Sequence, residues 1–310
     1  MPIAESESPM KPMRIITFDG GGICGLYSIV MLRRLLNEHP ELLDKTTILA
    51  GTSTGGIIAM GLAADIPIDH LIDLYRRRGR EIFHRPWHRR LLSPFGLRLS
   101  LYPNDGLVRV CHEVLGQTTI GSLDKKVIVP AFNLKSDASP EDPSWRMRFF
   151  HNLDDEDDDE KIADIAIRTA SAPAYFPAYQ GYIDGSVGCT DPSALAISQA
   201  ICHYPGLRLS DIRVLSIGTG GQIKYVDGQN MCWGGIQWLR PILKILIGSQ
   251  ALVSIAQSEK LLDKRYHRLC PIIPDIALDA VSKTEDLVRL AEKADLTDAL
   301  GFLENVFLPS

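Results

Sequence analysis

The sequence lacks the patterns of disulfide-rich, metal-knuckle and secreted proteins. Its six cysteines are scattered and no two of them form a CxxC pair. This spacing excludes a disulfide framework and a zinc knuckle, and it favours isolated thiols in a reducing compartment. Residues 1–12 are polar and include prolines, without the apolar core of a signal peptide. We therefore expect a cytoplasmic protein.

Long apolar runs and a strong excess of charge are absent as well. The most apolar stretch, 233–256, is interrupted by Arg240, Pro241 and Lys244, which makes it a poor membrane-spanning helix. The net charge of −5 is too small for a general nucleic-acid binder, so no nucleic-acid partner is expected. With 45% hydrophobic residues over 310 positions, the chain can bury one large core.

Apolar strand patterns alternate with helical patterns along the chain. Residues 14–18 form an apolar run that ends in DGGG, and 46–50 form one that ends in GTSTGG; a helical pattern follows each. This alternation predicts a layered α/β fold with a mostly parallel sheet. Without an internal repeat or a long linker, we expect one domain over 14–310 after a flexible segment, 1–13. Further strands are expected at 126–133, 147–150, 180–183 and 212–217, and further helices at 26–36, 57–64, 104–115, 162–170, 193–203, 235–263 and 284–305.

A GxSxG motif, residues 51–55, stands between a predicted strand and a predicted helix. The turn must be tight enough to raise the Ser53 hydroxyl over the sheet edge, and Gly51 and Gly55 remove Cβ clashes on both sides. The helix that follows directs its N-terminal N–H groups at developing negative charge. Ser53 is therefore a candidate nucleophile, and a plain glycine-rich turn is the alternative.

A glycine-rich loop, residues 20–25, follows Asp19 at the end of the first predicted strand. Consecutive glycines can direct backbone N–H groups into one cavity, where these groups hold an oxyanion or a phosphate. A dinucleotide site would need an acid at the end of the second strand. That strand runs into Gly51 instead, which argues against nucleotide binding by this loop.

The third motif is an aspartate that closes an apolar strand and meets a glycine, Asp184-Gly185. Asp-Gly alone is common turn chemistry. Parallel-sheet enzymes, however, gather their reactive groups at the carboxyl ends of strands. Because Asp19, Ser53 and Asp184 each follow a predicted strand directly, we expect these three side chains to cluster.

In this order, the motifs resemble those of the patatin-like phospholipase family, which pairs a DGGGxxG loop and a GxSxG serine with an Asp-Gly turn. Residues 169–177, 191–192 and 216–220 resemble further family features, so the likeness runs from about Arg14 to Pro271. It implies a three-layer α/β sandwich and a dyad in which Asp184 is the general base for Ser53. It also implies an oxyanion hole at Gly20, Gly21 and Gly22, and motif glycines at Gly25, Gly51, Gly55 and Gly185.

The resemblance further implies a lipid acyl hydrolase of phospholipase A type that needs no cofactor or metal. Its substrate would be a phospholipid or other acyl lipid at a membrane surface, which makes the protein peripheral to the membrane. Some bacterial relatives are switched on by a cyclic nucleotide, although no pattern here identifies a site for such an activator. The oligomeric state is not implied.

Three departures from the family pattern keep other functions open. Cys24 stands where the family often has arginine or lysine, Ser186 replaces a glycine or alanine, and Asp191 replaces an asparagine. A non-catalytic lipid-binding or scaffold protein is therefore one alternative, and an acyltransferase or thioesterase with the same acyl-enzyme is another. A Ser–Asp–His triad with His203 or His267 is formally available, but no motif surrounds either histidine.

Three other segments are unusual. Residues 76–98 carry eight arginines with several aromatic residues, as expected of a solvated loop or of a surface for anionic lipid. Residues 154–160 are seven consecutive acids, typical of a solvated loop and without the glycine of a calcium-binding EF-hand. Residues 233–253 predict a core helix, with an acyl-pocket wall or lid as the alternative. Pro86 argues against a helical metal site at His84 and His88.

Overall fold

The computed structural model describes residues 11–92, 98–136, 144–221 and 232–309. The expected flexible segment, 1–13, lies outside the described residues as far as position 10, and the first strand begins at Met13. Within the described residues, no helix is long and apolar enough to cross a membrane.

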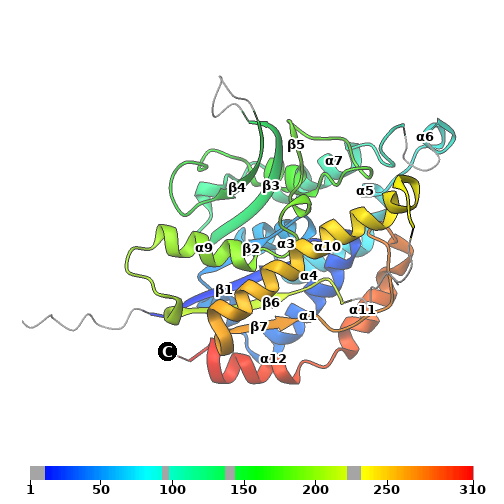
Figure 1. Cartoon of the computed structure of the whole chain (residues 1–310). Coiled ribbons are helices and arrows are strands. Elements are labelled where there is room, and N and C mark those ends of the chain that lie inside the picture. Colours follow the sequence, from blue (N-terminus) through cyan, green and yellow to red (C-terminus); the bar gives the residue numbers. More distant parts are fainter. Residues whose placement is uncertain (1–10, 93–97, 137–143, 222–231, 310) are drawn as a thin grey trace, which may run out of the picture.

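A seven-stranded sheet forms the centre of the molecule (Figure 1). The strand order is β4-β3-β2-β1-β6-β7, and β5 pairs with β3 beside this path. The pairs from β3 through β2, β1 and β6 to β7 are parallel, whereas β4 and β5 run antiparallel to β3. The strands are β1 (Met13–Phe18), β2 (Ile48–Gly51), β3 (Lys126–Ser136), β4 (Ser144–His151), β5 (Tyr182–Asp184), β6 (Ile212–Ile217) and β7 (Tyr266–Leu269).

Helices cover both faces of the sheet, which gives three layers (Figure 1). One face packs against α1, α3, α7, α8, α11 and α12, and the other against α9 and α10. The expected three-layer α/β sandwich with a mostly parallel sheet is confirmed. The helices are α1 (Gly25–Glu38), α2 (Leu42–Lys45), α3 (Thr54–Ala63), α4 (Ile68–Asp73), α5 (Gly79–Ile82), α6 (Trp87–Leu92), α7 (Asp105–Leu115), α8 (Ile162–Ala170), α9 (Ser193–His203), α10 (Gly235–Leu262), α11 (Thr284–Lys293) and α12 (Thr297–Phe302).

The two-residue period of the strands divides the core between the two faces. In β1, Ile16 and Phe18 belong to the larger hydrophobic cluster and Ile15 to the smaller one. In β2, Leu49 belongs to the larger cluster, whereas its neighbours belong to the smaller. Because successive side chains point to opposite faces, these continuous apolar runs are what a strand buried on both sides requires.

Two helical expectations need correction. The helix expected at 284–305 is divided into α11 and α12, because the backbone leaves the helical conformation at Ala294. In the turn that follows, Asp295 accepts hydrogen bonds from the N–H and hydroxyl of Thr297. The helix expected in the core, 233–253, is α10, and it is largely exposed. Its exposed apolar side chains include Ile245, Leu246, Ile247, Leu252 and Val253.

A buried ionic network joins the sheet to the segments at its carboxyl edge. The Arg268 guanidinium on β7 makes two hydrogen bonds to Asp19, which follows β1, and one of 2.9 Å to Asp191. It also donates to Ser216 on β6 at 2.7 Å. Although burial alone would lower the pKa of Arg268, the carboxylates of Asp19 and Asp191 keep it well above its ordinary value. The paired charges make the network depend on all of its members.

Asp191 extends this network to the helices of the second layer. Its carboxylate accepts hydrogen bonds from the backbone N–H of Ser193 at 2.7 Å, at the start of α9, and from the Ser254 hydroxyl of α10 at 3.1 Å. A charged residue therefore stands where the family pattern has asparagine, because it faces the positive charge of Arg268. One arginine thus fixes β1, β6, α9 and α10 relative to one another.

Replacing Arg268 should destabilise the fold strongly. Arg268→Met leaves Asp19 and Asp191 as buried charges without a partner, so we expect the free energy of unfolding to fall by about 3–5 kcal/mol. Urea denaturation measures this change. Arg289→Met removes an arginine whose side chain is 71% exposed and paired with Asp286 on the surface, and it should cost less than about 1 kcal/mol. Equal losses of unfolding free energy in the two variants would refute the role of Arg268 as the centre of the buried ionic network.

Candidate active site

Ser53 and Asp184 meet at the carboxyl edge of the sheet. The Ser53 hydroxyl donates a hydrogen bond of 2.6 Å to Oδ2 of Asp184. Both residues are nearly inaccessible to solvent, with exposed fractions of 6% for Ser53 and 3% for Asp184. A hydroxyl within hydrogen-bond reach of a buried carboxylate is the arrangement that a nucleophile and its base require.

The long strand β3 explains why residues so far apart in sequence come together. β2 pairs with Lys126–Ile128 and runs parallel to β3, ending at Gly51 just before Ser53. β5 pairs with Ala131–Asn133 and runs antiparallel, ending at Asp184 opposite Ala131. Since β4 occupies the other edge of β3, β2 and β5 share one edge and their ends approach each other. The expected clustering thus arises from an antiparallel strand, and not from parallel strand ends alone.

The backbone at Ser53 is strained in the way that a nucleophile turn requires. Ser53 has φ 55° and ψ −121°, a left-handed conformation that costs a residue with a side chain about 1–3 kcal/mol. Its N–H donates to the Thr169 hydroxyl at 2.9 Å, and that hydroxyl donates to the Pro130 carbonyl of β3. These bonds hold the turn in place at the start of α3.

Close backbone approaches explain the glycines of the motifs. A Cβ on Gly51 would lie 2.0 Å from the carbonyl oxygen of Gly55, and one on Gly55 would lie 2.2 Å from that of Phe18. A Cβ on Gly185 would lie 2.2 Å from the Pro130 carbonyl oxygen, and one on Gly25 would lie 2.1 Å from the Thr54 hydroxyl. Backbone cannot move away cheaply, so larger residues at these positions would displace the turn that carries Ser53 or the strand beside Asp184.

The glycine loop supplies fewer free donors than its sequence suggests. The N–H of Gly20 donates to the Thr190 carbonyl at 3.0 Å, so it is occupied. Gly21 and Gly22 begin the short helix η1 (Gly22–Cys24), where N–H groups have no partner within the helix. Neither N–H has a partner among the described residues. Of the three expected oxyanion donors, Gly21 and Gly22 are therefore the available ones.

The environment of Asp184 makes it a stronger base than an exposed aspartate. Burial raises the pKa of Asp184 to about 6, even though hydrogen bonds from Ser53 and Ser186 favour the charged form. The backbone N–H of Ser186 donates to Oδ1 at 2.7 Å, which leaves Oδ2 for Ser53. A carboxylate with a pKa nearer neutrality is better matched to proton abstraction.

Asp19, expected in the same cluster, does not join the dyad. Its carboxylate is buried and paired with Arg268, as described above, so it anchors the glycine loop and is not placed for chemistry. Cys24, where the family often has a basic residue, is buried and lies 3.8 Å from the Ile276 carbonyl. The oxyanion site therefore depends on backbone donors.

Neither candidate histidine of a triad is placed beside the dyad. His203 contacts the Gln199 carbonyl and Asp154 at the end of α9, and His267 stacks on Phe302. His84 lies between α5 and α6, so no helix carries it together with His88.

The motifs did not single out Thr169 as a support of the Ser53 turn or Arg268 as the partner of Asp19. Thr169 stands in one of the family-like stretches, whereas Arg268 carries no local signal.

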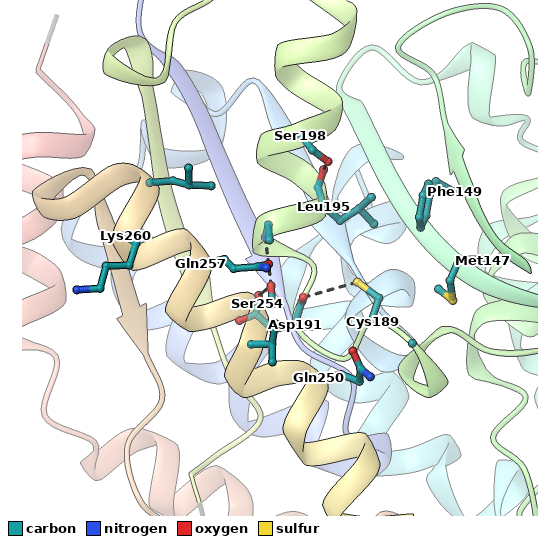
Figure 2. A pocket seen from close by; sticks show the side chains of 14 residues that line it. Met147, Phe149, Cys189, Asp191, Leu195, Ser198, Gln250, Ser254, Gln257 and Lys260 are labelled. Atoms are coloured by element: carbon teal, nitrogen blue, oxygen red, sulfur yellow. Dashed lines mark hydrogen bonds between the residues drawn. The ribbon is translucent and has the colours of Figure 1, made fainter.

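A cavity of about 720 Å³ lies between β4, α9 and α10 (Figure 2). Met147 and Phe149 come from β4, Leu195 comes from α9, and Val253 and Leu261 come from α10. Neither Ser53 nor Asp184 lines this cavity, but its wall includes Gly188, Cys189 and Asp191, which follow the dyad aspartate in the chain. Figure 2 shows Ser254 and Asp191 in contact at its base.

The arginine-rich segment is partly neutralised by the chain itself. Arg76 pairs with Glu285, Arg77 with Asp73, and Arg78 with both Glu81 and Glu113. Residues 93–97 lie outside the described residues. Carboxylates thus already occupy three of the arginines that were candidates for anionic headgroups, although Trp87 is 73% exposed.

The sequence of this chain is similar to those of known proteins. The Patatin-like phospholipase family matches residues 16–197, which include both members of the dyad. The chain is 30% identical to Protein teg of Priestia megaterium over 95% of this chain and 99% of that protein. It is 28% identical to the putative sporulation hydrolase CotR of Bacillus subtilis over 95% of this chain and 98% of that protein. It is also 30% identical to a cGAMP-activated phospholipase of Pseudomonas aeruginosa, over 76% and 71%.

The match covers more than half of the chain and includes the whole stretch from the glycine loop to α9. Relatives named as phospholipases support a lipid-hydrolysing enzyme. The fold and the matched sequence therefore lead to one conclusion: this chain belongs to the patatin-like phospholipase family.

Proposed function

We propose that this protein is a lipid acyl hydrolase of phospholipase A type in which Ser53 is the nucleophile and Asp184 the general base. The observation that carries the proposal is the 2.6 Å hydrogen bond from the Ser53 hydroxyl to a buried carboxylate. No histidine is needed, because burial already raises the pKa of Asp184 to about 6.

The reaction proceeds through an acyl-enzyme. Ser53 Oγ attacks the ester carbonyl carbon while its proton passes to Oδ2 of Asp184. The N–H groups of Gly21 and Gly22 stabilise the negative charge on the carbonyl oxygen. The ester bond then breaks, and the leaving alcohol takes the proton from Asp184. Water attacks the acyl-enzyme, gives a proton to Asp184, and releases the fatty acid as that proton returns to Ser53.

Removal of either member of the dyad should abolish turnover in the assay of free fatty acid released from mixed phospholipid vesicles. We expect Ser53→Ala to lower the rate by roughly 10³-fold or more, because the nucleophile is lost. Asp184→Asn should lower it by about 10²–10⁴-fold, because the base is lost. Ser198→Ala, a hydroxyl deletion on α9, is the matched control and should retain the wild-type rate.

Covalent labelling separates this proposal from its alternatives. A fluorophosphonate should label the wild type and not Ser53→Ala, and a Ser53→Ala protein that still releases fatty acid would refute the dyad. A wild type that binds vesicles without turnover or labelling would favour a non-catalytic lipid-binding protein. Alcohol acceptors in the assay detect acyl transfer. The assay is run with and without a cyclic dinucleotide, because one relative bears the name cGAMP-activated phospholipase.

The pH dependence of the reaction should report the protonation of Asp184. With its pKa raised to about 6 by burial, the carboxyl is protonated below that pH and cannot accept the Ser53 proton. We expect kcat/KM on a soluble ester to fall as the pH drops through about 6 and to level off above it.

Ser186→Ala should move this midpoint to higher pH. The Ser186 side chain favours the charged form of Asp184, so removing its hydroxyl should raise the pKa of Asp184 further. Ser198→Ala is again the control and should leave the midpoint unchanged. A flat profile, or a midpoint shifted to lower pH in Ser186→Ala, would contradict the role of Asp184 as base.

We propose that the exposed apolar row of α10, Ile245–Val253, contacts the lipid surface. Leu252 is 68% exposed and Val253 53%, although both are apolar. The Thr190 hydroxyl donates to the Ile247 carbonyl at 3.2 Å, and the Thr190 carbonyl accepts from Gly20 of the glycine loop. The row is therefore joined to the oxyanion loop through one residue. An acyl lipid is the partner whose chemistry matches both the row and the dyad.

Leu252→Asp should impair hydrolysis of vesicles but not of a soluble ester. Burying one leucine contributes roughly 1.5–3 kcal/mol, so we expect about a tenfold loss on vesicles, with little change on p-nitrophenyl butyrate. Leu209→Asp is the matched control. Leu209 is exposed and precedes β6, so it lies at the end of β6 opposite to the carboxyl edge that carries the dyad. Equal losses on both substrates would contradict a membrane contact at α10.

A further inference from the structure

Two histidines and an aspartate gather at the far end of the α9–β4 interface, outside the dyad. His151 is the last residue of β4, Asp154 lies in the acidic loop that follows, and His203 is the last residue of α9. One ligand atom from each, an imidazole nitrogen or a carboxylate oxygen, lies within 4.8 Å of the other two.

The cluster lies at the end of a strand that lines the cavity in Figure 2. Along β4, Met147, Phe149 and His151 share a face because side chains alternate, and the first two line the cavity. His203 reaches this strand from the end of α9, and the ring centroids of His151 and His203 are 4.8 Å apart. The end of β4 and the end of α9 therefore meet at the two imidazoles.

The hydrogen bonding of His203 leaves a bare nitrogen directed at a carboxylate. Its Nδ1 is 2.9 Å from the Gln199 carbonyl, which can only accept, so Nδ1 carries the proton. In a neutral imidazole Nε2 then has only a lone pair, and it lies 3.1 Å from Oδ2 of Asp154, another acceptor. With a neutral imidazole, these two acceptors need a cation between them, and a second proton on His203 is the other arrangement that satisfies both. Metal-binding histidines are oriented in the same way, because the ring nitrogen that does not bind the metal donates its proton to a carbonyl.

His151 adds a second and independent sign of a missing ligand. Its side chain is only 9% exposed, and its Nδ1 is 3.7 Å from Oδ1 of Asp154. That nitrogen is buried without a hydrogen-bond partner among the described residues. A buried polar atom without a partner is costly, so it points to a group that the protein atoms do not supply.

The loop that carries Asp154 is fixed by its neighbours. Asp157, 2% exposed, accepts a hydrogen bond from the backbone N–H of His151 at 3.1 Å and pairs with Arg148 of β4. Asp157 is thereby used within the protein, whereas Asp154 remains directed at the two histidines. The surrounding acids of 154–160 add negative potential that attracts a cation.

We propose that His151, Asp154 and His203 bind one zinc ion at this point. Nitrogen ligands exclude calcium and magnesium, which prefer oxygen, and two imidazoles with one carboxylate suit zinc. Ligands of tetrahedral zinc lie about 3.3 Å apart, given bond lengths of about 2.0–2.1 Å. The distances of 3.1 Å from His203 Nε2 to Oδ2 of Asp154 and of 3.7 Å from His151 Nδ1 to Oδ1 are close to this, and one ligand atom of each residue lies within 4.8 Å of the other two. Water completes the coordination.

The ion would tie the acidic loop and β4 to the end of α9. It would thereby hold the end of β4, two residues beyond Phe149 in the wall of the cavity. Its role is structural, and hydrolysis at Ser53 does not pass through it. The rival is a second proton on His203, which would make a simple ion pair with Asp154.

Zinc binding to the untagged, chelator-treated full chain tests the proposal. Isothermal titration with zinc should show one equivalent bound, and zinc should raise the melting temperature. His203→Ala and Asp154→Asn should each weaken zinc binding by about tenfold or more, since even loss of a supporting hydrogen bond typically costs 10–100-fold. His112→Ala is the matched control, because His112 lies 3.7 Å from Asp164 without a second histidine. It should bind zinc as the wild type does.

Three results would overturn the proposal. In the first, zinc produces neither heat of binding nor a shift in melting temperature, and the His203–Asp154 ion pair then explains the cluster. The variants and His112→Ala could bind zinc equally, which would place the metal elsewhere. The cobalt-substituted protein could show thiolate charge-transfer absorption, which would assign the metal to cysteines. Nitrogen and oxygen ligands predict no such absorption.

Discussion

The buried guanidinium of Arg268 is the interaction on which the active-site region depends. It neutralises Asp19 at the entrance to the glycine loop and Asp191 in the segment after the dyad aspartate. Asp191 in turn bonds the start of α9 and the middle of α10. A buried charge pair contributes little net stability compared with apolar packing, but removing one partner is severe. The network therefore acts mainly to specify where the loop, the segment and the two helices lie.

Burial also sets the pKa of Asp184, the proposed base. A low-dielectric site raises the energy of a charged carboxylate, and this is why the pKa of Asp184 rises to about 6. The two hydrogen bonds to its oxygens limit this rise, so the carboxylate is a better base while it is still ionised at neutral pH. Full apolar burial without these bonds would leave the group protonated. The Ser186 position, where the family has a smaller residue, is thus part of this balance.

Much of this site could be predicted because its signals are local. The strand–turn–helix around Ser53 and the Asp-Gly turn at Asp184 are each read from a few adjacent residues. The Arg268 network could not be predicted, because Asp19, Asp191 and Arg268 lie far apart in sequence and pair only through strand order. The same holds for His151 and His203, which meet because β4 and α9 end together. The error at α10 has another cause, since an apolar helix in a core and one with an exposed apolar row can have the same composition.

Access to the dyad follows from these constraints. Ser53 is only 6% exposed, and the base needs a site from which water is largely excluded. A soluble substrate would have to displace the residues that cover Ser53 without gaining free energy from the burial of apolar surface elsewhere. If α10 contacts lipid as proposed, burial of its exposed apolar side chains contributes free energy at the place where lipid meets the protein. Two hydrogen bonds join α10 to the neighbourhood of the dyad, one from the Thr190 hydroxyl to the Ile247 carbonyl and one from the Ser254 hydroxyl to Asp191. The apolar row and the buried dyad are therefore two parts of one requirement, that water leave the site as lipid enters.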